Sequence, residues 1–233
     1  MATYVLVHGA WYGSWCWKRV RTALQAAGHE VFTPTLTGVG ERSHLNSRDV
    51  NLSTHINDVV NLIKWEGLSD VILCGHSYSG CVISGAADQI SDKIRALIYL
   101  DAFVLEDGEC LFDLAREDWV QFVRQQTQES GDGWKVAPTP AEFFNVNQQD
   151  SAWVDAQCTS QSLACWEEPI KLTQRFADIK NVTHILATGY PPILQPSHDR
   201  AKAKGWKTST VDCGHAVMLD RPGELTELLL EYV

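Results

Sequence analysis

The chain has 233 residues, of which 45% are hydrophobic and 21% are charged, and its formal net charge is -10. These proportions argue against a disordered or fibrous protein, and the length fits one domain or one domain with an elaborated insertion. The acidic balance and the lack of a Lys/Arg cluster argue against nucleic acid as a partner.

No stretch of the sequence reaches the roughly 18 apolar residues of a membrane span, and the first residues lack the basic region and cleavage site of a signal peptide. We therefore expect no membrane partner and a cytoplasmic location. The seven cysteines show no C-x-x-C spacing and no accompanying histidine pattern. We expect free thiols and no metal site.

The first half of the chain alternates short β-branched runs with helical patterns, which is typical of βαβ units and a parallel sheet. Gly28 closes the first helix, and Ser53 or Thr54 caps the second. The fourth strand is buried and ends at Asp101. The expected strands lie at residues 4–7, 30–34, 70–74 and 94–100, and the expected helices at residues 16–27, 54–66 and 77–87.

After about residue 105 the sequence becomes polar and Gln-rich, with scattered tryptophans and no strand pattern, which predicts an inserted helical segment. Strand patterns resume at residues 183–187 and 208–211, with a helix around residues 197–204 between them and an amphipathic helix after Pro222. The predicted fold class is α/β, with a mostly parallel sheet flanked by helices. Its core comprises residues 1–104 and 181–233, and the insertion comprises residues 105–180.

The segment VILCGHSYSG places Ser77 between a buried strand and a helix, which is the context of a nucleophile elbow. In such a turn the serine backbone is strained, and small neighbours are needed because strand and helix approach closely. Gly75 and Gly80 meet this need, whereas Ser79 stands where a second glycine is usual. The alternative is an ordinary Gly/Ser turn that caps a helix.

The segment LVHGAW ends the first strand with His8 and Gly9, which allow a loop to bend back over the sheet edge. An oxyanion hole needs two backbone N–H groups, one from the residue after the nucleophile and one from an early loop. The expected donors are the amides of Tyr78 and Ala10.

The segment VDCGHAVMLDRP puts His215 in a loop after the last strand, at the carboxyl end of the sheet. A single histidine is more often a surface or core residue. This one, however, follows the serine in the order Ser, acid, His that a triad on a nucleophile elbow takes. His215 is the predicted base, and His76, beside Ser77, is predicted to be structural.

These segments resemble the α/β-hydrolases, and within them a small-ester branch that includes plant methyl-salicylate esterases and hydroxynitrile lyases. The likeness is strongest in VLVHGAWYGSWCW, GHSYSG, IYLDAFV and GHAVMLDRP, and it is weakest from about residue 105 to 180. The resemblance implies an α/β-hydrolase fold in which this middle stretch is a helical cap that closes over the active site and sets substrate choice.

The tryptophans of the predicted cap are candidates for the walls of an apolar pocket, and a cap core of their own is an equally good interpretation of them. Together with one tryptophan after the first strand they form the predicted substrate-binding set: Trp11, Trp119, Trp134, Trp153 and Trp166.

The acid of the triad is where this sequence departs from those relatives. They carry an Asp in the loop after the strand at residues 183–187, but here that loop reads ATGYPPIL, with no carboxylate before Asp199. Some other α/β-hydrolases, including haloalkane dehalogenases, place the acid after the strand that follows the nucleophile helix, which here gives Asp101. A buried carboxylate needs a partner, and the imidazole N–H of His215 would provide one. Asp101 is the predicted acid and Asp199 the second candidate; alternatively, Asp101 caps a turn or binds backbone amides.

The resemblance implies a serine hydrolase that cleaves a small, hydrophobic ester or related acyl bond through an acyl-enzyme, without a metal or organic cofactor. An alternative is a lyase acting on cyanohydrins. Hydroxynitrile lyases have a Thr after the first-strand histidine and a Lys after the catalytic one, where this chain has Gly9 and Ala216. A non-catalytic receptor for a small hydrophobic ligand and a cofactor-free oxygenase are further alternatives. The sequence does not identify the physiological substrate, and assembly into a homodimer is compatible with it.

Overall fold

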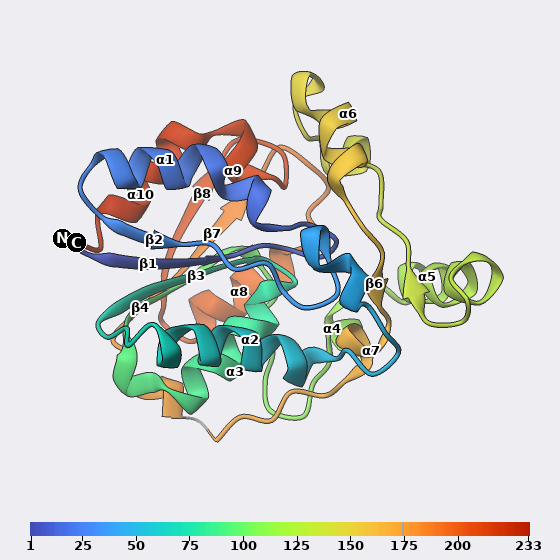
Figure 1. Cartoon of the computed structure of the whole chain (residues 1–233), viewed down its shortest axis with the longest axis horizontal. Helices are drawn as coiled ribbons and strands as arrows, with labels where there is room; N and C mark the ends of the chain where they lie inside the picture. The colour runs from blue at the N-terminus through green and yellow to red at the C-terminus, as the bar shows by residue number, and fades with distance from the viewer. Residues whose placement is uncertain (174) are drawn as a thin grey trace.

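Residues 1–173 and 175–233 are described by a computed structural model. At its centre lies a six-stranded sheet in which every described strand pair is parallel. Parallel neighbours require crossover connections, which the helices between the strands supply. In spatial order the strands are β2 (Glu30–Phe32), β1 (Thr3–Val7), β3 (Val71–Ser77), β4 (Ile94–Ala102), β7 (Asn181–Ala187) and β8 (Lys207–Val211) (Figure 1).

The middle of this sheet is buried on both faces. Every residue of β3 is buried, and in β4 only Arg95 is partly exposed. The runs VILCGHS and IRALIYLDA are accordingly close to continuous apolar sequences, as strands covered on both sides require. Ser77 ends β3 and Asp101 lies one residue before the end of β4. Both therefore reach the carboxyl edge of the sheet, where open α/β proteins place their binding sites.

Helices cover both faces of the sheet. Figure 1 shows α1, α9 and α10 on one face and α2 and α3 on the other. Short 3-10 helices lie in several of the connections, namely η1 (Ser14–Trp17), η2 (Gly40–Leu45) and η3 (Ser91–Lys93). The helices that flank the sheet are α1 (Lys18–Ala26), α2 (Leu52–Trp65), α3 (Ser79–Gln89), α8 (Gln195–Ala203), α9 (Val217–Asp220) and α10 (Pro222–Leu230).

Several element boundaries differ from the sequence prediction by a few residues, and two of the differences have a clear physical reason. The cap of α2 is Asn51 rather than Ser53 or Thr54, because the Asn51 side chain accepts a hydrogen bond from the Thr54 amide in a capping box. β3 continues through Ser77, whereas the sequence predicts a strand that stops at residue 74. Glycine is depleted in strands, so Gly75 lowers the strand propensity of this segment, and the sequence alone does not predict that β3 continues past it.

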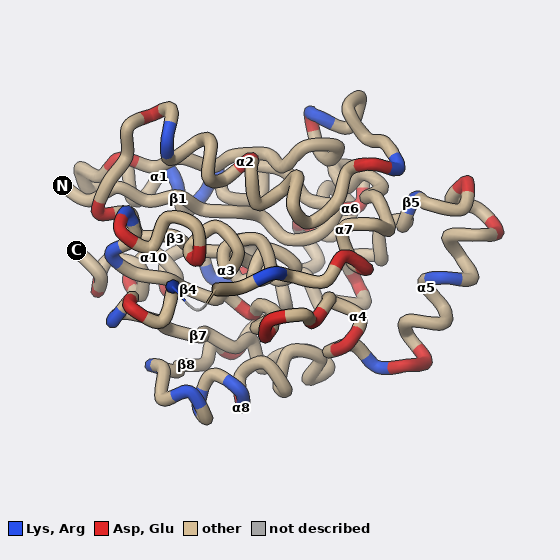
Figure 2. Tube along the Cα trace, turned by 90° about the horizontal axis from the view of Figure 1, so that it is seen from below, with Lys and Arg blue, Asp and Glu red and all other residues tan. Residues whose placement is uncertain are grey.

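The connection between β4 and β7 begins at residue 103 and ends at residue 180, and its elements α4, α5, α6 and α7 lie at the end of the molecule opposite the two chain termini (Figures 1 and 2). The prediction of a segment without strands is wrong in one detail, because β5 and β6 pair antiparallel. Strands of two residues are too short to show an alternating pattern. The segment contains α4 (Leu111–Leu114), α5 (Glu117–Ser130), β5 (Lys135–Val136), η4 (Ala141–Phe144), α6 (Gln148–Gln157), β6 (Gln161–Ser162), α7 (Ala164–Glu167) and η5 (Arg175–Asp178).

The cysteines are free thiols, and only Cys110 and Cys158 are partly exposed. Burial raises the pKa of thiols such as that of Cys74, so the buried ones act as small protonated hydrophobic side chains. Within the described ranges, no helix combines the length and the apolar character needed to cross a bilayer.

Candidate active site

Ser77 lies at a sharp turn between β3 and α3. Its φ of 56° falls in the left-handed region, which a residue with a side chain rarely adopts. The Phe103 amide donates to the Ser77 carbonyl at 3.1 Å and so holds this backbone in place from the neighbouring strand. A strained serine held by its surroundings is the geometry of a nucleophile elbow.

The small residues around the elbow are required by close backbone approaches. A Cβ at Gly75 would lie 2.6 Å from the Ser79 carbonyl oxygen, and one at Gly80 would collide with the carbonyl oxygen of Phe103. The Ser79 hydroxyl donates to the His8 carbonyl oxygen. Serine thus fits where a glycine is usual, and it ties the elbow to the loop after β1.

His215 forms hydrogen bonds with both of its predicted partners. Its Nε2 lies 2.9 Å from Ser77 Oγ, and its Nδ1 lies 2.6 Å from Asp101 Oδ2, although Asp101 and His215 are 114 positions apart in the chain. The Asp101 side chain is fully buried. An ionised carboxylate only accepts hydrogen bonds, so Nδ1 carries the proton and the lone pair of Nε2 faces the serine hydroxyl. That tautomer is the one a general base needs.

Asp199, the second candidate acid, does not reach the histidine. It lies on the exposed side of α8, where Gln195 Nε2 donates to its carboxylate at 2.8 Å. Asp101 does bind a backbone amide as well, because the N–H of Ala187 donates to its Oδ1 at 3.1 Å. Asp101 therefore combines the amide contact of the alternative interpretation with the contact to His215.

Ala10 and Tyr78 line the same pocket as Ser77. Neither N–H donates a hydrogen bond to any acceptor in the part of the chain that the structure describes. The Tyr78 side chain is held on the far side by His55, whose Nδ1 accepts from the phenol hydroxyl at 2.9 Å while Nε2 donates to the Thr37 carbonyl at 2.8 Å. Two free backbone donors beside a serine hydroxyl are the components of an oxyanion hole.

His76 and His8, which lie next to these residues, are buried and bind backbone groups of the site. His76 Nε2 donates to the backbone carbonyl of His215 at 2.9 Å, and burial, followed by the neighbouring His215, holds the pKa of His76 well below its ordinary value. His8 Nε2 accepts from the Leu36 amide at 3.0 Å, and burial lowers the pKa of His8 to about 4. Both side chains are therefore neutral near pH 7, and His76 adds no positive charge beside His215.

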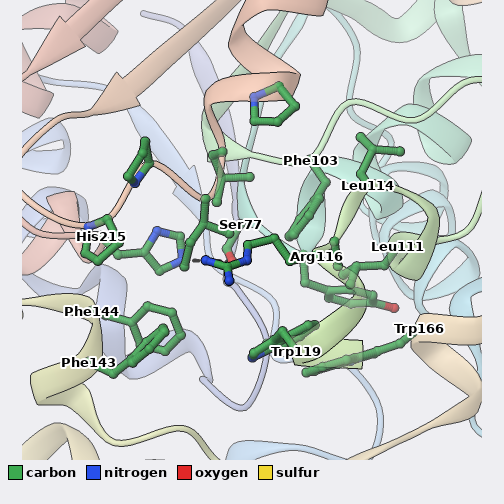
Figure 3. Close-up of a pocket in the computed structure, with 18 of the residues that line it drawn as sticks. Ser77, Phe103, Leu111, Leu114, Arg116, Trp119, Phe143, Phe144, Trp166 and His215 are labelled. Carbon is green, nitrogen blue, oxygen red and sulfur yellow. Dashed lines mark hydrogen bonds between the residues drawn. The ribbon is translucent and has the colours of Figure 1, made fainter. Parts of the chain in front are cut away.

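A pocket of about 530 Å³ opens above Ser77 and His215, and its lining is mostly aromatic and aliphatic (Figure 3). Trp11, Trp119 and Trp166 line it as predicted from the sequence. Trp119 and Trp166 are stacked, with ring centroids 5.4 Å apart and an interplanar angle of 14°. A pocket of this size and composition suits a compact apolar ligand.

Trp134 and Trp153 do not line this pocket, so the prediction that they bind substrate there does not agree with the structure. The Trp134 ring contacts two cations, with Arg48 Cζ and Lys135 Nζ at 5.9 and 5.1 Å from its centroid. Trp153 packs edge-on against Trp15 at 4.9 Å and is 39% exposed. Trp134 lies in a turn, and the sequence of α6 around Trp153 is mainly polar, so neither position shows a periodicity from which the buried face could be predicted.

Three other aromatic residues near His215 have no strong signal in the sequence. Phe143 and Phe144 lie beside His215, and the Phe144 ring centroid is 5.0 Å from that of the imidazole. The pair FF in a polar, Gln-rich stretch is the one hint of them. The Tyr190 ring lies 5.2 Å from the imidazole, and burial, followed by the Asp101 carboxylate, raises the pKa of Tyr190.

Charged groups at the pocket are paired with each other. Arg116 and Asp118 both line it, and the guanidinium Nε and Nη2 lie 3.1 and 2.5 Å from the two carboxylate oxygens. Asp118 also accepts from the Trp119 amide at 2.9 Å. In residues 1–173 and 175–233 no group of three or more His, Cys, Asp or Glu side chains is arranged to hold a metal ion.

Comparisons with known proteins agree on one group of relatives. A model of the alpha/beta hydrolase family matches residues 4–228. The carbendazim hydrolyzing esterase of Nocardioides sp. (strain SG-4G) is 45% identical over 240 residues, which cover 98% of this chain and 98% of that protein. The putative methylesterase 13, chloroplastic, of Arabidopsis thaliana is 25% identical over 98% of this chain, which spans only 55% of that longer protein.

Among solved structures, an extracellular alpha/beta-hydrolase from a Paenibacillus species superimposes with a TM-score of 0.87 at 22% identity, over 100% of this chain and 99% of that one. That protein is described as sharing structural and functional homology with tobacco salicylic acid binding protein 2. At this level of identity the likeness shows the common fold.

Proposed function

The chain belongs to the alpha/beta hydrolase family and is an ester hydrolase, and from this premise we propose that Ser77 is its nucleophile, His215 its base and Asp101 the acid of its triad. The observation that carries the proposal is the continuous chain of hydrogen bonds from Asp101 through His215 to Ser77, with contacts of 2.6 and 2.9 Å. It lies beside an apolar pocket, where water competes little with these contacts.

In the proposed reaction, His215 Nε2 takes the proton of the Ser77 hydroxyl as Oγ attacks the substrate carbonyl. Asp101 stabilises the imidazolium that forms and keeps the ring in its orientation. The imidazolium then gives the proton to the leaving alcohol, and an acyl-enzyme remains on Oγ. In the second half, water attacks the acyl carbon while His215 takes its proton. The bond between Ser77 Oγ and the acyl carbon then breaks, His215 returns the proton to Oγ, and the acid leaves.

We assign the oxyanion hole to the backbone amides of Ala10 and Tyr78. Both are free to donate, and both stand at the pocket beside Ser77. One such donor contributes roughly 2.7 to 4 kcal/mol to the transition state in serine hydrolases, because the donor is already oriented when the charge develops.

We propose that residues 105–180 form a cap over this site and that Trp11, Trp119 and Trp166 bind the apolar part of the substrate. Since Arg116 and Asp118 neutralise each other, the pocket favours uncharged esters. One relative is named for hydrolysing carbendazim and another as a putative methylesterase, so carbendazim and methyl esters of small aromatic acids are the first substrates to test.

Hydrolysis is favoured over a cyanohydrin lyase by the residue after His215. Ala216 is fully buried and apolar, whereas the lyases carry a lysine there. We further propose that the reaction needs no metal or organic cofactor, because Ser77 and His215 supply both the nucleophile and the base. The cytoplasmic location and the assembly state remain predictions.

The test is a pre-steady-state experiment with a 4-nitrophenyl ester. An acyl-enzyme mechanism predicts a rapid burst of 4-nitrophenol, equal in amount to the enzyme, before a slower steady rate. Ser77→Ala should abolish the burst and lower turnover on the order of a millionfold while the chain stays folded. Full esterase activity in that variant would contradict the assignment, and a folded, ligand-binding wild-type chain without turnover would favour a receptor.

A further inference from the structure

The backbone of His215 is held by a residue of the proposed cap. The His215 N–H donates to the Phe144 carbonyl oxygen at 2.9 Å, and the two rings lie 5.0 Å apart with an interplanar angle of 34°. Phe144 is the last residue of η4, far from His215 in the chain. The position of the base therefore depends on a cap segment as well as on its own loop.

The next cap residue contacts both the loop after β7 and the His215 loop. Asn145 is left-handed, with φ 51°, and its Nδ2 donates to the Gly189 carbonyl at 2.7 Å. Its own carbonyl oxygen lies so close to Gly214 that a Cβ there would collide with it. Glycine is required before His215 because the cap backbone and the His215 loop touch at this point.

Asn147 ties the cap to the other end of the His215 loop. Its backbone N–H and its Nδ2 both donate to Asp220 Oδ1, at 3.0 and 2.8 Å. The same Nδ2 lies 2.7 Å from Asp150 Oδ2, so Asn147 stands between two carboxylates. Asp220 ends α9, the short helix that follows His215.

Arg19 of α1 binds the cap from the core side. Its two terminal nitrogens bind the Asp150 carboxylate at 2.6 and 2.7 Å, and one of them also donates to the Leu219 carbonyl at 2.8 Å. A bidentate guanidinium contact of this kind fixes orientation as well as distance. We define the cap seam as the cap residues Phe144, Asn145, Asn147 and Asp150 together with the core residues Arg19, Gly189 and Asp220.

We propose that the cap seam positions His215, with Asn147 as a positioning residue, so that the base is assembled only while the cap is docked on the core. The inference rests on the proposed role of His215. A displacement of about 1 Å at a catalytic group costs on the order of a hundredfold in rate. Undocking the cap withdraws the Phe144 carbonyl and the Asn147 contacts to Asp220 together, which removes the cap's contacts from both ends of the His215 loop. The open molecule would then admit substrate without a competent base, and closure would restore it.

The test uses a small phosphylating agent, diisopropyl fluorophosphate, on the full chain. Ser77 Oγ attacks phosphorus, fluoride leaves, and the serine proton goes to His215, so the rate reports the base while the reagent makes few cap contacts. We compare Asn147→Ala, which removes the seam hydrogen bonds of that side chain, with Asn147→Asp, which places a third carboxylate beside Asp150 and Asp220. Labelling is followed by peptide mass, and thermal unfolding and ester kcat and KM are measured alongside.

The matched control is Ser151→Ala, on the same helix α6. The Ser151 hydroxyl donates only to carbonyls of Val146 and Asn147, both within the cap. We expect this variant to react at the wild-type rate. For Asn147→Ala we expect phosphylation and ester kcat to fall in parallel by roughly ten- to a hundredfold at every pH, with a larger fall for Asn147→Asp. If Asn147→Asp does not fold, Asn147→Ala decides.

Three results would overturn the inference. The first is wild-type phosphylation in a folded Asn147→Ala, even if KM for esters rises, because the seam would then only shape the pocket. The second is an equal fall in Ser151→Ala, which would indicate a general effect of cap stability. The third is an unlabelled Ser77 in the wild-type chain, which would refute the proposed nucleophile itself and the inference with it.

Discussion

Replacing Asp101 with Asn tests the triad at its most specific contact. The Ala187 amide donates to Oδ1 at 3.1 Å, so the oxygen of the new amide stays on that side and its NH2 group faces His215. His215 Nδ1 must then accept rather than donate, which moves the ring proton to Nε2, 2.9 Å from Ser77 Oγ. In that tautomer the histidine has no lone pair for the serine proton.

The expected loss in kcat is up to about ten-thousandfold, by analogy with the same change in serine proteases. At 1.36 kcal/mol for each factor of ten, this corresponds to about 5 kcal/mol of transition-state stabilisation. KM should change little, since Asp101 does not line the pocket.

The assay is steady-state hydrolysis of a 4-nitrophenyl ester near pH 7, with circular dichroism to confirm folding. Asp199→Asn is the matched control, because it makes the same chemical change at an exposed carboxylate whose described side-chain contact is Gln195. It should keep wild-type turnover. Asp101→Asn within tenfold of wild type would refute the reasoning, and a collapse in Asp199→Asn would transfer the role of the acid.

Three other predictions follow from the geometry. Trp119→Ala should raise KM for an aromatic ester by roughly ten- to a hundredfold through the lost pocket wall, whereas Trp134→Ala should leave KM unchanged; equal effects would contradict the pocket assignment. Gly80→Ala should lower the free energy of unfolding by roughly 1 to 3 kcal/mol in urea titrations, because its Cβ meets a backbone oxygen, and an unchanged midpoint would show that the elbow can relax. Burial lowers the pKa of His8 and of His184 from 6.5 to about 4, so the unfolded chain binds more protons than the folded chain between these values. Stability should therefore fall as pH decreases, by roughly 1.5 kcal/mol per histidine between pH 6.5 and pH 5, and urea titrations that show no such loss would mean that the two histidines are accessible to protons.

The parallel sheet could be predicted from the sequence because its strands are buried, β-branched runs separated by helical patterns. The same argument places Ser77, Asp101 and His215 at one edge, since carboxyl ends of parallel strands meet there. The pairing of Asp101 with His215 follows from the cost of an unpaired buried carboxylate. The structure shows that contact at 2.6 Å.

The lining of the pocket could be predicted only in part. Trp119 and Trp166 meet in a stack, but Trp134 and Trp153 contact other surfaces. Trp134 lies in the turn before β5, and α6, which carries Trp153, has the mainly polar sequence QQDSAWVDAQ with no clear apolar face. The seam residue Asn147 has no sequence signature of its role. Its partner Asp220 is 73 positions away, and only the folded chain brings them together.

The most direct test of the central claim is to trap the acyl-enzyme and locate it. The chain is mixed with 4-nitrophenyl acetate and quenched in acid during the burst. It is then digested, and the peptide masses are measured by mass spectrometry. The account predicts one acetyl group on the peptide that contains Ser77, and none in His215→Ala under the same conditions. A burst without acetylated Ser77, or with the acetyl group on a cysteine or another serine, would contradict it.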